Sequence, residues 1–491
     1  MVMVDRIADG EVARNYVGGE WREATGDESG DVVNPATGER VGTVPFSSAD
    51  DEDEAVALAN EAFAEWSSTA VEERIQPLFR LKSLLEEHQE SLAEVLVTEH
   101  GKTKREAMGE IRRGIENVEV ACGVPSTMQA GHLPHAAPDI DETAVRQPLG
   151  TVVAVTPFNF PAMIPLWFLP YAVATGNTFV LKPSERDPFT PNRIAELVDE
   201  AGFPDGVVNV VHGGPDTVNR LITHDGVEAV SFVGSTPIAE HVYETAAGAG
   251  KRVQAQGGAK NHVVVSANAD LAYAAEKTCS SAFANAGQRC LANPVAVVED
   301  AVYDEFVDRL VAEAEAMEVG PGLDEGTDMG PLVSGPHRDS VLEYVEAGVE
   351  EGAEVLLDGR ERDVPEEGYH LGPTVFGDVD PDASVAREEI FGPVLALLRA
   401  EDFDDALSLV NRSRYGNAAS LFTRDGGEAR RFRLEVDAGN VGVNVGTAAP
   451  MAFFHFGGDK DSFFGDLHAQ GDDAVRFYTD ETVYIERWPD A

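Results

Sequence analysis

The sequence predicts an α/β fold with a Rossmann-type parallel sheet. Three observations lead to this prediction. Short apolar runs alternate with amphipathic stretches from residue 151 onward, most of these runs stop at a glycine or a proline, and the alternation returns over residues 262–440. Strands and helices that alternate at this spacing form βαβ units, whose strands pair in parallel. The second stretch therefore predicts a second α/β domain.

The individual elements follow from these patterns in chain order. Residues 54–66 and 71–100 have the apolar period of amphipathic helices. We expect strands at residues 151–155, 177–181, 207–211 and 229–233. We expect further helices at residues 190–201, from Pro237 onward and at 271–285. Proline suits the first turn of a helix, because an N–H there would have no partner inside the helix.

Two segments predict a small β arm. Residues 126–145 have no helical period and predict a projecting hairpin. Residues 474–488 resemble a strand, which we expect to pair with that hairpin in a neighbouring subunit. The arm would then serve oligomerisation.

Charge limits the partners of the chain. Its 491 residues are too many for one core and predict two or three domains. Lys and Arg number 37 against 87 Asp and Glu, so the net charge is −50. Such a chain repels nucleic acid and anionic membranes, which excludes both as partners. The acidic residues are spread over the whole chain, as a solvated surface adapted to molar salt would require. We therefore expect the cytosol of a salt-loving organism.

Three cysteines occur, at positions 122, 279 and 290. An odd and unpatterned set argues against a disulfide framework and against a structural zinc site, so no metal is expected. No run of 18 apolar residues appears, and the first residues lack the pattern of a signal peptide. These observations favour a cytoplasmic protein.

Cys290 is the candidate nucleophile. It ends the segment Asn-Ala-Gly-Gln-Arg-Cys at 285–290, in a turn beyond a predicted helix. A cysteine at such a junction and beside an arginine can have a lowered pKa. Taken alone, one cysteine is more often a buried filler, and we assign that role to Cys122 and Cys279.

Four further motifs surround this cysteine in the sequence. Asn159, in Pro-Phe-Asn-Phe-Pro, is rigidly placed and can donate to an oxyanion, although a simple turn explains the motif too. Lys182 and Glu185 follow the second strand, where side chains grip ribose hydroxyls. Ser235 precedes a helix whose N-terminus can hold a pyrophosphate, although its single glycine is a weak signal. Glu389 lies in Glu-Glu-Ile-Phe-Gly-Pro.

In order and spacing, these five motifs resemble the aldehyde dehydrogenase superfamily over nearly the whole chain. The resemblance implies a thioacyl-enzyme on Cys290, with Asn159 and the Cys290 N–H holding the oxyanion. It implies NAD as cofactor, held by Lys182 and Glu185 at the adenosine ribose, Ser235 at the pyrophosphate, and Glu389 and Phe391 at the nicotinamide ribose and ring. Glu185 would repel a 2′-phosphate, which favours NAD over NADP.

One departure from the common family pattern concerns Gln256. Hydrolytic members carry a glutamate there that activates water, whereas glutamine cannot accept the proton. Water has a pKa near 15.7 and needs a base, whereas about 3% of a free thiol is already thiolate at pH 7. The substitution therefore favours coenzyme A as acyl acceptor.

The Gly-Ala-Lys-Asn-His string after this position is similar to the CoA-acylating methylmalonate-semialdehyde dehydrogenases. That branch implies cofactor contacts at Thr156, Phe158, Arg186 and Gly257. It also implies that Arg289 and Arg113 hold the substrate carboxylate. Arg289 flanks the nucleophile, and a guanidinium forks onto a carboxylate. The apolar stripe of its helix leaves Arg113 on the opposite side, so the residues alone predict a surface position. Gln288 and His455 differ within matching motifs and receive no role.

The branch implies oxidation of methylmalonate or malonate semialdehyde to propionyl-CoA or acetyl-CoA, with CO2 and NADH, in valine and inositol breakdown. The motifs leave the choice between the two substrates open. One rival is a hydrolytic dehydrogenase of another aldehyde that uses a different base. A second rival is an inactive relative with a binding or structural role, against which intact Cys290 and Asn159 argue.

The resemblance also assigns the parts of the chain. We expect an NAD-binding domain at 1–125 and 146–258, a catalytic domain at 259–445, and an oligomerisation arm at 126–145 and 470–491. The family suggests a homodimer or a homotetramer built from dimers.

Overall fold

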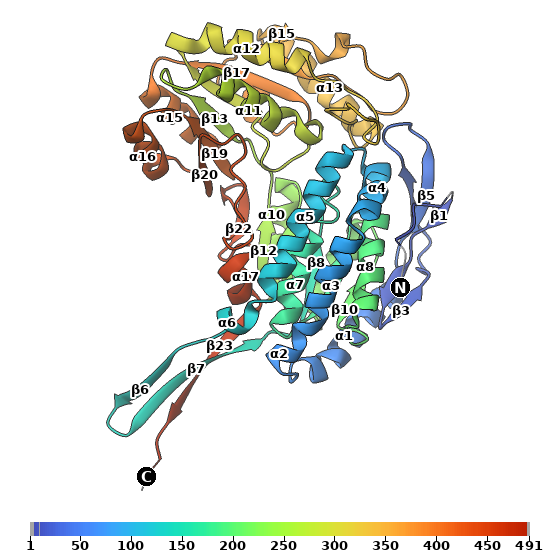
Figure 1. Cartoon of the computed structure of the whole chain (residues 1–491). Helices are drawn as coiled ribbons and strands as arrows, with labels where there is room; N and C mark the ends of the chain where they lie inside the picture. The colour runs from blue at the N-terminus through green and yellow to red at the C-terminus, as the bar shows by residue number, and fades with distance from the viewer. Residues whose placement is uncertain (1–3, 9, 489–491) are drawn as a thin grey trace.

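The computed structural model describes residues 4–8 and 10–488. Residues 1–3 and 9 of the expected NAD-binding domain and residues 489–491 of the expected arm therefore lie outside the described residues. The structure confirms the α/β fold, with two large sheets and a projecting arm (Figure 1). In Figure 1 the second sheet and its helices lie above the first, and the arm extends from the lower end.

The first large sheet has eight strands in the order β22-β12-β11-β8-β9-β10-β2-β3. Its parallel centre consists of β8 (Thr151–Val155), β9 (Thr178–Lys182), β10 (Val208–Val210), β11 (Ala229–Val233) and β12 (Arg252–Gln256). Its antiparallel edges consist of β2 (Asn15–Val17), β3 (Glu20–Arg22) and β22 (Phe463–Gly465). Chain order reverses between β8 and β11, and ligands of such sheets bind outside the carboxyl ends of the strands at this point.

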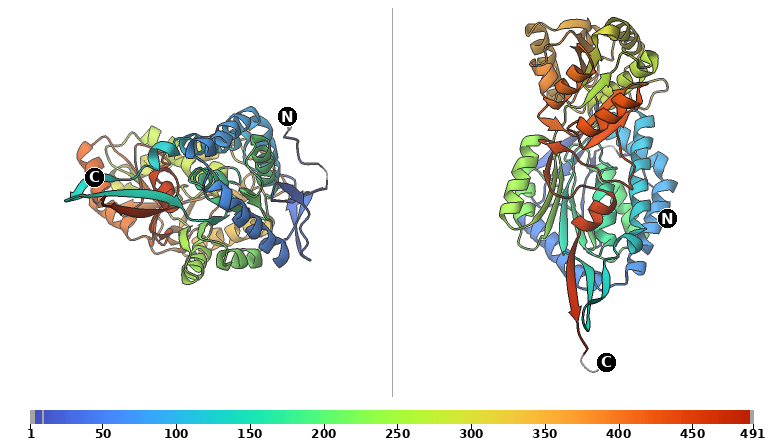
Figure 2. Two further views of the ribbon diagram at one scale, coloured as in Figure 1. Left: turned by 90° about the horizontal axis from the view of Figure 1, so that it is seen from below. Right: turned by 90° about the vertical axis from the view of Figure 1, so that its left-hand side faces the viewer.

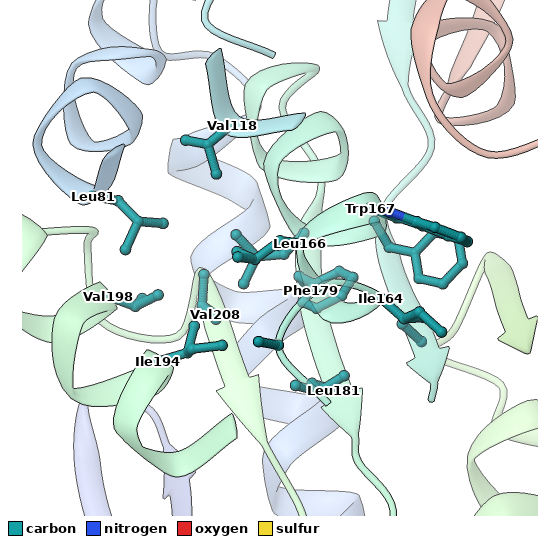
Figure 3. Close-up of a cluster of buried hydrophobic side chains, with 14 of the residues drawn as sticks. Leu81, Val118, Ile164, Leu166, Trp167, Phe179, Leu181, Ile194, Val198 and Val208 are labelled. Atoms are coloured by element: carbon teal, nitrogen blue, oxygen red, sulfur yellow. The ribbon is translucent and has the colours of Figure 1, made fainter. Parts of the chain in front are cut away.

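Helices cover both faces of this sheet. One face packs on α1 (Ala49–Trp66), α9 (Pro215–Thr223) and α10 (Thr236–Gly248). The other packs on α3 (Gln76–Glu87), α4 (Gln89–His100), α5 (Lys104–Ala121), α7 (Pro165–Ala174) and α8 (Phe189–Ala201). Along β8, Val152 and Ala154 enter one core, and Val153 and Val155 enter the other, because successive strand side chains point to opposite faces. Figure 3 shows the larger core, in which Phe179 of β9 lies beside Leu166 of α7, and Leu181 of the same strand belongs to the same cluster.

The second large sheet has the order β15-β16-β17-β14-β13-β19-β20 and is parallel except for β15. Its strands are β13 (His262–Val265), β14 (Val295–Glu299), β15 (Glu354–Leu357), β16 (Thr374–Gly377), β17 (Val394–Ala400), β19 (Ala418–Phe422) and β20 (Asn440–Val443). Its helices are α11 (Leu271–Phe283), α12 (Tyr303–Glu315), α13 (Gly335–Glu350), α14 (Ser384–Arg387), α15 (Phe403–Asn411) and α16 (Gly426–Glu435). Three short 3-10 helices occur at Ala284–Gly287, Asp300–Val302 and Gly359–Glu361.

The arm is a three-stranded antiparallel sheet of β6 (His132–Ala137), β7 (Ile140–Pro148) and β23 (Thr479–Glu486). It points away from the second large sheet, as the right-hand view of Figure 2 shows. The expected pairing in a neighbouring subunit was wrong, because β23 pairs with the hairpin of its own chain. The expected strand from residue 474 begins only at Thr479, because α17 (Gly471–Phe477) precedes it with a buried apolar face.

The remaining elements are short. They are the sheet of β1 (Glu11–Val12), β4 (Ser29–Val33) and β5 (Arg40–Pro45), the pair β18 (Tyr415–Gly416) and β21 (Asp459–Lys460), and the helices α2 (Val71–Arg74) and α6 (Val124–Thr127).

The single helix expected at 71–100 is divided into α2, α3 and α4, with breaks at Ile75 and His88. The helix expected from residue 54 begins at Ala49, because Ser48 and Asp51 form a capping box there. Within residues 4–8 and 10–488, no helix has the length and apolar character to cross a bilayer.

Candidate active site

A cavity of about 440 Å³ contains Cys290 in its wall. Its lining comes from α5, from the segment after β8, from the turn before Cys290 and from the chain between Thr447 and Gln470. The charged residues of the wall are Lys102, Glu106, Glu110, Arg113, Glu116 and Arg289. The cavity therefore combines an apolar interior with both signs of charge beside a thiol. In the part of the chain that the structure describes, no group of three or more His, Cys, Asp and Glu side chains is placed to hold a metal ion.

The turn before Cys290 has strained backbone. Helix α11 ends at Phe283, and Asn285, Ala286 and Gly287 then have φ values of 57°, 51° and 73°. Residues other than glycine avoid this left-handed region, so Asn285 and Ala286 keep this conformation only because surrounding contacts hold the turn. One such contact is the backbone N–H of Asn285, which donates to Glu106 Oε1 at 2.6 Å.

Cys290 is held through its carbonyl oxygen. The side-chain amides of Asn261 and Asn417 donate to this oxygen at 2.8 and 2.7 Å. Burial raises the pKa of the Cys290 thiol to about 12, and the neighbouring Arg289 opposes this only in part. The expected lowering of this pKa was wrong, because sequence shows the nearby charge and not the loss of water around the sulfur. Cys122 and Cys279 are buried, as expected of fillers.

Asn159 lies 3% exposed above a buried ion pair. Its side-chain Nδ2 donates to the backbone carbonyl oxygen of Gln288 at 3.1 Å. The backbone carbonyl oxygen of Asn159 accepts from Lys102 Nζ at 2.7 Å. Lys102 also pairs with Glu110 at 2.5 Å, and both side chains are fully buried. Gln288, to which no role was assigned, thus orients the predicted oxyanion donor, whereas His455 is exposed and stacks on His468.

The two predicted carboxylate ligands line the same cavity. Arg289 donates to the carbonyl oxygen of Ser281 at 3.0 Å and to Thr447 Oγ1 at 3.3 Å, while its buried Nε has no partner among the described residues. Arg113 pairs with Glu116 at 2.9 Å. The Arg113 side chain is 35% exposed, so it lies at the surface as its helix alone predicted, and it lines the cavity as well. Helix α5 has a second, polar stripe, formed by residues 106, 110, 113 and 117, and this stripe faces the cavity.

The predicted cofactor residues gather at the carboxyl ends of the first large sheet. Lys182 ends β9, lies 4% exposed and pairs with Glu185 at 3.2 Å. Thr156 follows β8, and its buried hydroxyl has no partner among the described residues. The guanidinium of Arg186 lies 5.8 Å from the ring centre of Phe158. Two strand ends thus present a cation, a carboxylate and a free hydroxyl to one edge.

A second group lies beyond β11 and β12. Ser235 is the N-cap of α10, and its exposed hydroxyl makes no capping bond. Gly257 donates to the carbonyl oxygen of Ser462 at 2.9 Å, and a side chain on Gly258 would lie 2.3 Å from Glu389 Oε2. Because glycine has no side chain, the Glu389 carboxylate can lie this close to the backbone at position 258.

Glu389 accepts from the Ala259 N–H at 2.8 Å, and burial raises its pKa to about 7. Phe391 has a φ of 55°, and its ring meets that of Phe158 edge-on at 5.9 Å. Gln256, at the end of β12, is 4% exposed, and both of its side-chain polar atoms lack a partner among the described residues.

Sequence reasoning missed four positioning residues, Lys102, Glu106, Asn261 and Asn417. The polar stripe of α5 is a signal that points to Glu106, and Asn261 lies in the Gly-Ala-Lys-Asn-His string, although that string gave it no role. Asn417 carries no local signal, because it acts on the Cys290 carbonyl oxygen from a position just before β19, far away in the sequence.

Comparison with known proteins places these residues in context. The model of the aldehyde dehydrogenase family matches residues 21–483. The chain is 49% identical over 479 residues to malonate-semialdehyde dehydrogenase 2 of Bacillus mycoides, covering 97% of this chain and 99% of the relative. It is 47% identical over 482 residues to malonate-semialdehyde dehydrogenase of Halalkalibacterium halodurans, covering 98% and 99%.

Solved structures are similar over the same length. One is a putative methylmalonate-semialdehyde dehydrogenase from Sinorhizobium meliloti 1021 complexed with NAD, with a TM-score of 0.97 and 42% identity over 98% of this chain and 99% of the other. Another is a methylmalonate-semialdehyde dehydrogenase from Oceanimonas doudoroffii, with a TM-score of 0.96 and 44% identity over 99% of both chains.

Proposed function

This chain belongs to the aldehyde dehydrogenase family, and we propose that it oxidises malonate or methylmalonate semialdehyde with NAD and passes the acyl group to coenzyme A. One observation carries the substrate class: two guanidinium groups, of Arg113 and Arg289, share the wall of one cavity with the Cys290 thiol. A small aldehyde that carries a carboxylate matches this combination of a charged end and a reactive centre.

The residues at the sheet edge fit NAD. Lys182 and Glu185 offer a donor and an acceptor for ribose hydroxyls, and the Ser235 hydroxyl and the start of α10 offer donors for a pyrophosphate. Glu389 offers a carboxylate to the second ribose, with Thr156, Phe158, Arg186, Gly257 and Phe391 around it. The bound cofactor supplies the hydride acceptor.

The chain's own groups carry the acylation step. Cys290 first loses its thiol proton to solvent water, and the thiolate then adds to the aldehyde carbon, so that the carbonyl oxygen becomes an oxyanion. Asn159 keeps one amide proton on Gln288 and has a second one for this oxygen, together with the Cys290 N–H. Loss of a hydride from the same carbon restores the carbonyl and leaves a thioester on Cys290.

Gln256 decides the acyl acceptor. It stands where hydrolytic relatives have their base, and an amide cannot accept the proton of water. Each carboxylate of the cavity wall is already engaged: Glu110 by Lys102, Glu116 by Arg113, and Glu106 by Asn285. A thiolate from coenzyme A needs no base when it attacks the thioester and displaces Cys290.

The carboxylate also explains the release of CO2. A β-carboxyl thioester loses CO2 through an enolate, whose oxygen Asn159 can stabilise as it does the first oxyanion. Malonate semialdehyde then yields acetyl-CoA, and methylmalonate semialdehyde yields propionyl-CoA, as valine and inositol breakdown require.

Hydrolysis is the rival function, and one observation favours it. Glu389 has a pKa of about 7, as a general base requires, and its charge acts on Cys290. This carboxylate is, however, needed by the cofactor ribose during the first half of the reaction.

A stopped-flow experiment in molar potassium chloride separates the two functions. Without coenzyme A, the wild type should release a burst of NADH and then turn over slowly, because the thioacyl-enzyme waits for unactivated water. Coenzyme A should accelerate the slow phase by about 10²-fold or more, the factor that general-base help is worth. Fast steady turnover without coenzyme A would support hydrolysis instead.

The remaining assignments belong to the same proposal. We assign the NAD-binding domain to residues 1–125 and 146–258, which supply the strands of the first sheet except its edge strand β22, and the catalytic domain to residues 259–445, which supply the second sheet. The arm (126–145 and 470–491) joins subunits into a homodimer or homotetramer, and its exposed Leu133, Val483 and Ile485 suit an interface.

The net charge of −50 suits the cytosol of a salt-loving organism. Activity and subunit assembly should therefore fall together when salt is dialysed away, whereas equal stability in dilute buffer would contradict the halophilic assignment.

A further inference from the structure

Gln470 occupies the cavity wall in an unusual state. Its φ is 70° and its ψ is 164°, a backbone conformation that side chains other than glycine avoid. It belongs to the stretch of chain from Thr447 to Gln470 that forms one side of the cavity. The charged residues of the wall all come from earlier parts of the chain, at positions 102–116 and 289. Strained residues cluster at ligand sites, because the surrounding structure must hold them there.

The contacts on both sides of Gln470 fix this conformation. The carbonyl oxygen of Ala469 accepts from the Phe456 N–H at 2.7 Å. The Gly471 N–H donates to the Tyr171 hydroxyl at 3.4 Å, and a side chain at Gly471 would lie 2.8 Å from the Phe453 carbonyl oxygen. The chain therefore cannot relax without losing its anchors, and the side chain of Gln470 is kept at the cavity.

The side chain itself has an unmet polar atom. Gln470 is 3% exposed, and its Oε1 is buried without a partner among the described residues. A buried polar atom without a hydrogen bond destabilises the fold, and such atoms are rare outside functional sites. The Nε2 of the same amide is not enclosed in this way and makes no hydrogen bond to a described residue, so its N–H groups are left for an anion in the cavity that Gln470 lines.

We propose that Gln470 is a substrate-binding residue that donates through its amide to the carboxylate of the semialdehyde, in the cavity it shares with Arg113 and Arg289. This inference rests on the proposed function. The neutral amide adds a donor without adding a third positive charge, in a wall that also contains the carboxylates of Glu106, Glu110 and Glu116.

Three variants separate this role from a structural one. Gln470→Met keeps the volume of the side chain and removes the amide that would donate to the substrate carboxylate. Gln470→Glu places a negative charge there, which repels that carboxylate. Gln470→Gly relieves the backbone strain and removes the amide. Gln254→Met is the control for a purely structural loss. Gln254 is buried in β12 outside the cavity lining, and its Nε2 donates to Ser231 Oγ at 2.9 Å, so this variant removes a hydrogen bond of the fold and no group of the cavity.

The readout is KM and kcat for malonate semialdehyde and for propanal, which has no carboxylate, beside thermal unfolding. Gln470→Met and Gln470→Gly should raise KM for the semialdehyde about tenfold or more, and Gln470→Glu should give the largest increase in KM. The kcat of all three variants should change little. KM for propanal should stay within about twofold to threefold. Gln254→Met should leave the ratio of the two KM values unchanged.

Two results would overturn the proposal. One is a Gln470→Gly enzyme that is stabilised and keeps the wild-type KM for the semialdehyde. The other is an equal rise in KM for both aldehydes in Gln470→Met. A wild-type enzyme that does not prefer the semialdehyde to propanal would refute the proposed substrate class instead, so the two failures are distinguishable.

Discussion

The two sides of Cys290 are built in different ways. On the proposed cofactor side, Lys182 ends β9, Glu185 follows β9 and Ser235 follows β11. These two strands flank β8 in one parallel sheet, so the positions of the three residues come directly from strand order. On the aldehyde side, Arg113 and Gln470 come from segments more than 300 residues apart, which meet only through packing. The cofactor side is thus a property of the sheet, whereas the aldehyde side is a property of the whole fold.

The largest expected effect tests whether the two sides are separable at Cys290. Cys290→Ala should lower NADH formation by about 10³-fold or more, because no nucleophile remains. NAD affinity, measured by fluorescence titration, should stay near the wild-type value, because the predicted cofactor ligands lie elsewhere. Near-normal turnover would require Cys279 or Cys122 to be the nucleophile, although neither of them lines the cavity that contains Cys290.

The next effect concerns the aldehyde side alone. Arg289→Leu should weaken binding of the semialdehyde by about 2–5 kcal/mol, because a desolvated carboxylate loses a charged partner. KM measurements with malonate semialdehyde and propanal should show this loss for the first aldehyde only. Arg113→Leu should act in the same direction. Equal losses for both aldehydes would count against a carboxylate site.

A matched pair of variants tests the strained turn that joins the two sides. Gly287→Ala should destabilise the enzyme by more than about 1 kcal/mol and slow acylation, because a Cβ there would lie 2.2 Å from the Gly392 carbonyl oxygen. Ala286→Gly relieves a φ of 51° and should leave unfolding temperature and activity nearly unchanged or slightly raised. If both variants lose the same stability, the turn is not strained at these positions.

The smallest effect concerns the cofactor side and pH. Burial raises the pKa of Glu389 to about 7, so in the free enzyme the carboxyl is protonated below pH 7 and charged above it. Ribose hydroxyls donate best to the charged form, so NAD affinity should rise about tenfold between pH 6 and pH 8 and then level off. Titrations at several pH values test this, and Glu389→Gln should give a flat profile. A wild-type affinity that is constant over this range would remove Glu389 from the ribose site.

Sequence alone predicted the α/β class and the parallel strands of the first sheet, which the structure confirms, and it supplied the candidate nucleophile and the candidate cofactor motifs. Strands 151–155 and 229–233 were predicted with their observed bounds, because each is a short apolar run closed by a polar or glycine turn. Residues 71–100 were predicted as one helix, because the apolar period continues across the breaks at Ile75 and His88. Pro77, in the first turn of α3, is a local signal of the first break that the period outweighed.

Tertiary structure alone decided the rest. The helix of Arg113 presents two stripes, and only its packing against α7 shows that the polar one faces a cavity. The pKa of Cys290 depends on how much water the fold removes from around the sulfur. The residues next to Cys290 in the sequence do not determine this. The strand at 479–486 pairs within its own chain because the chain returns beside β7. The paired residues lie far apart in the sequence, from Thr479 with Pro148 to Glu486 with Asp141. Motifs at strand ends can be predicted because a parallel sheet brings them to one edge, whereas a cavity wall depends on distances between segments that only the folded chain sets.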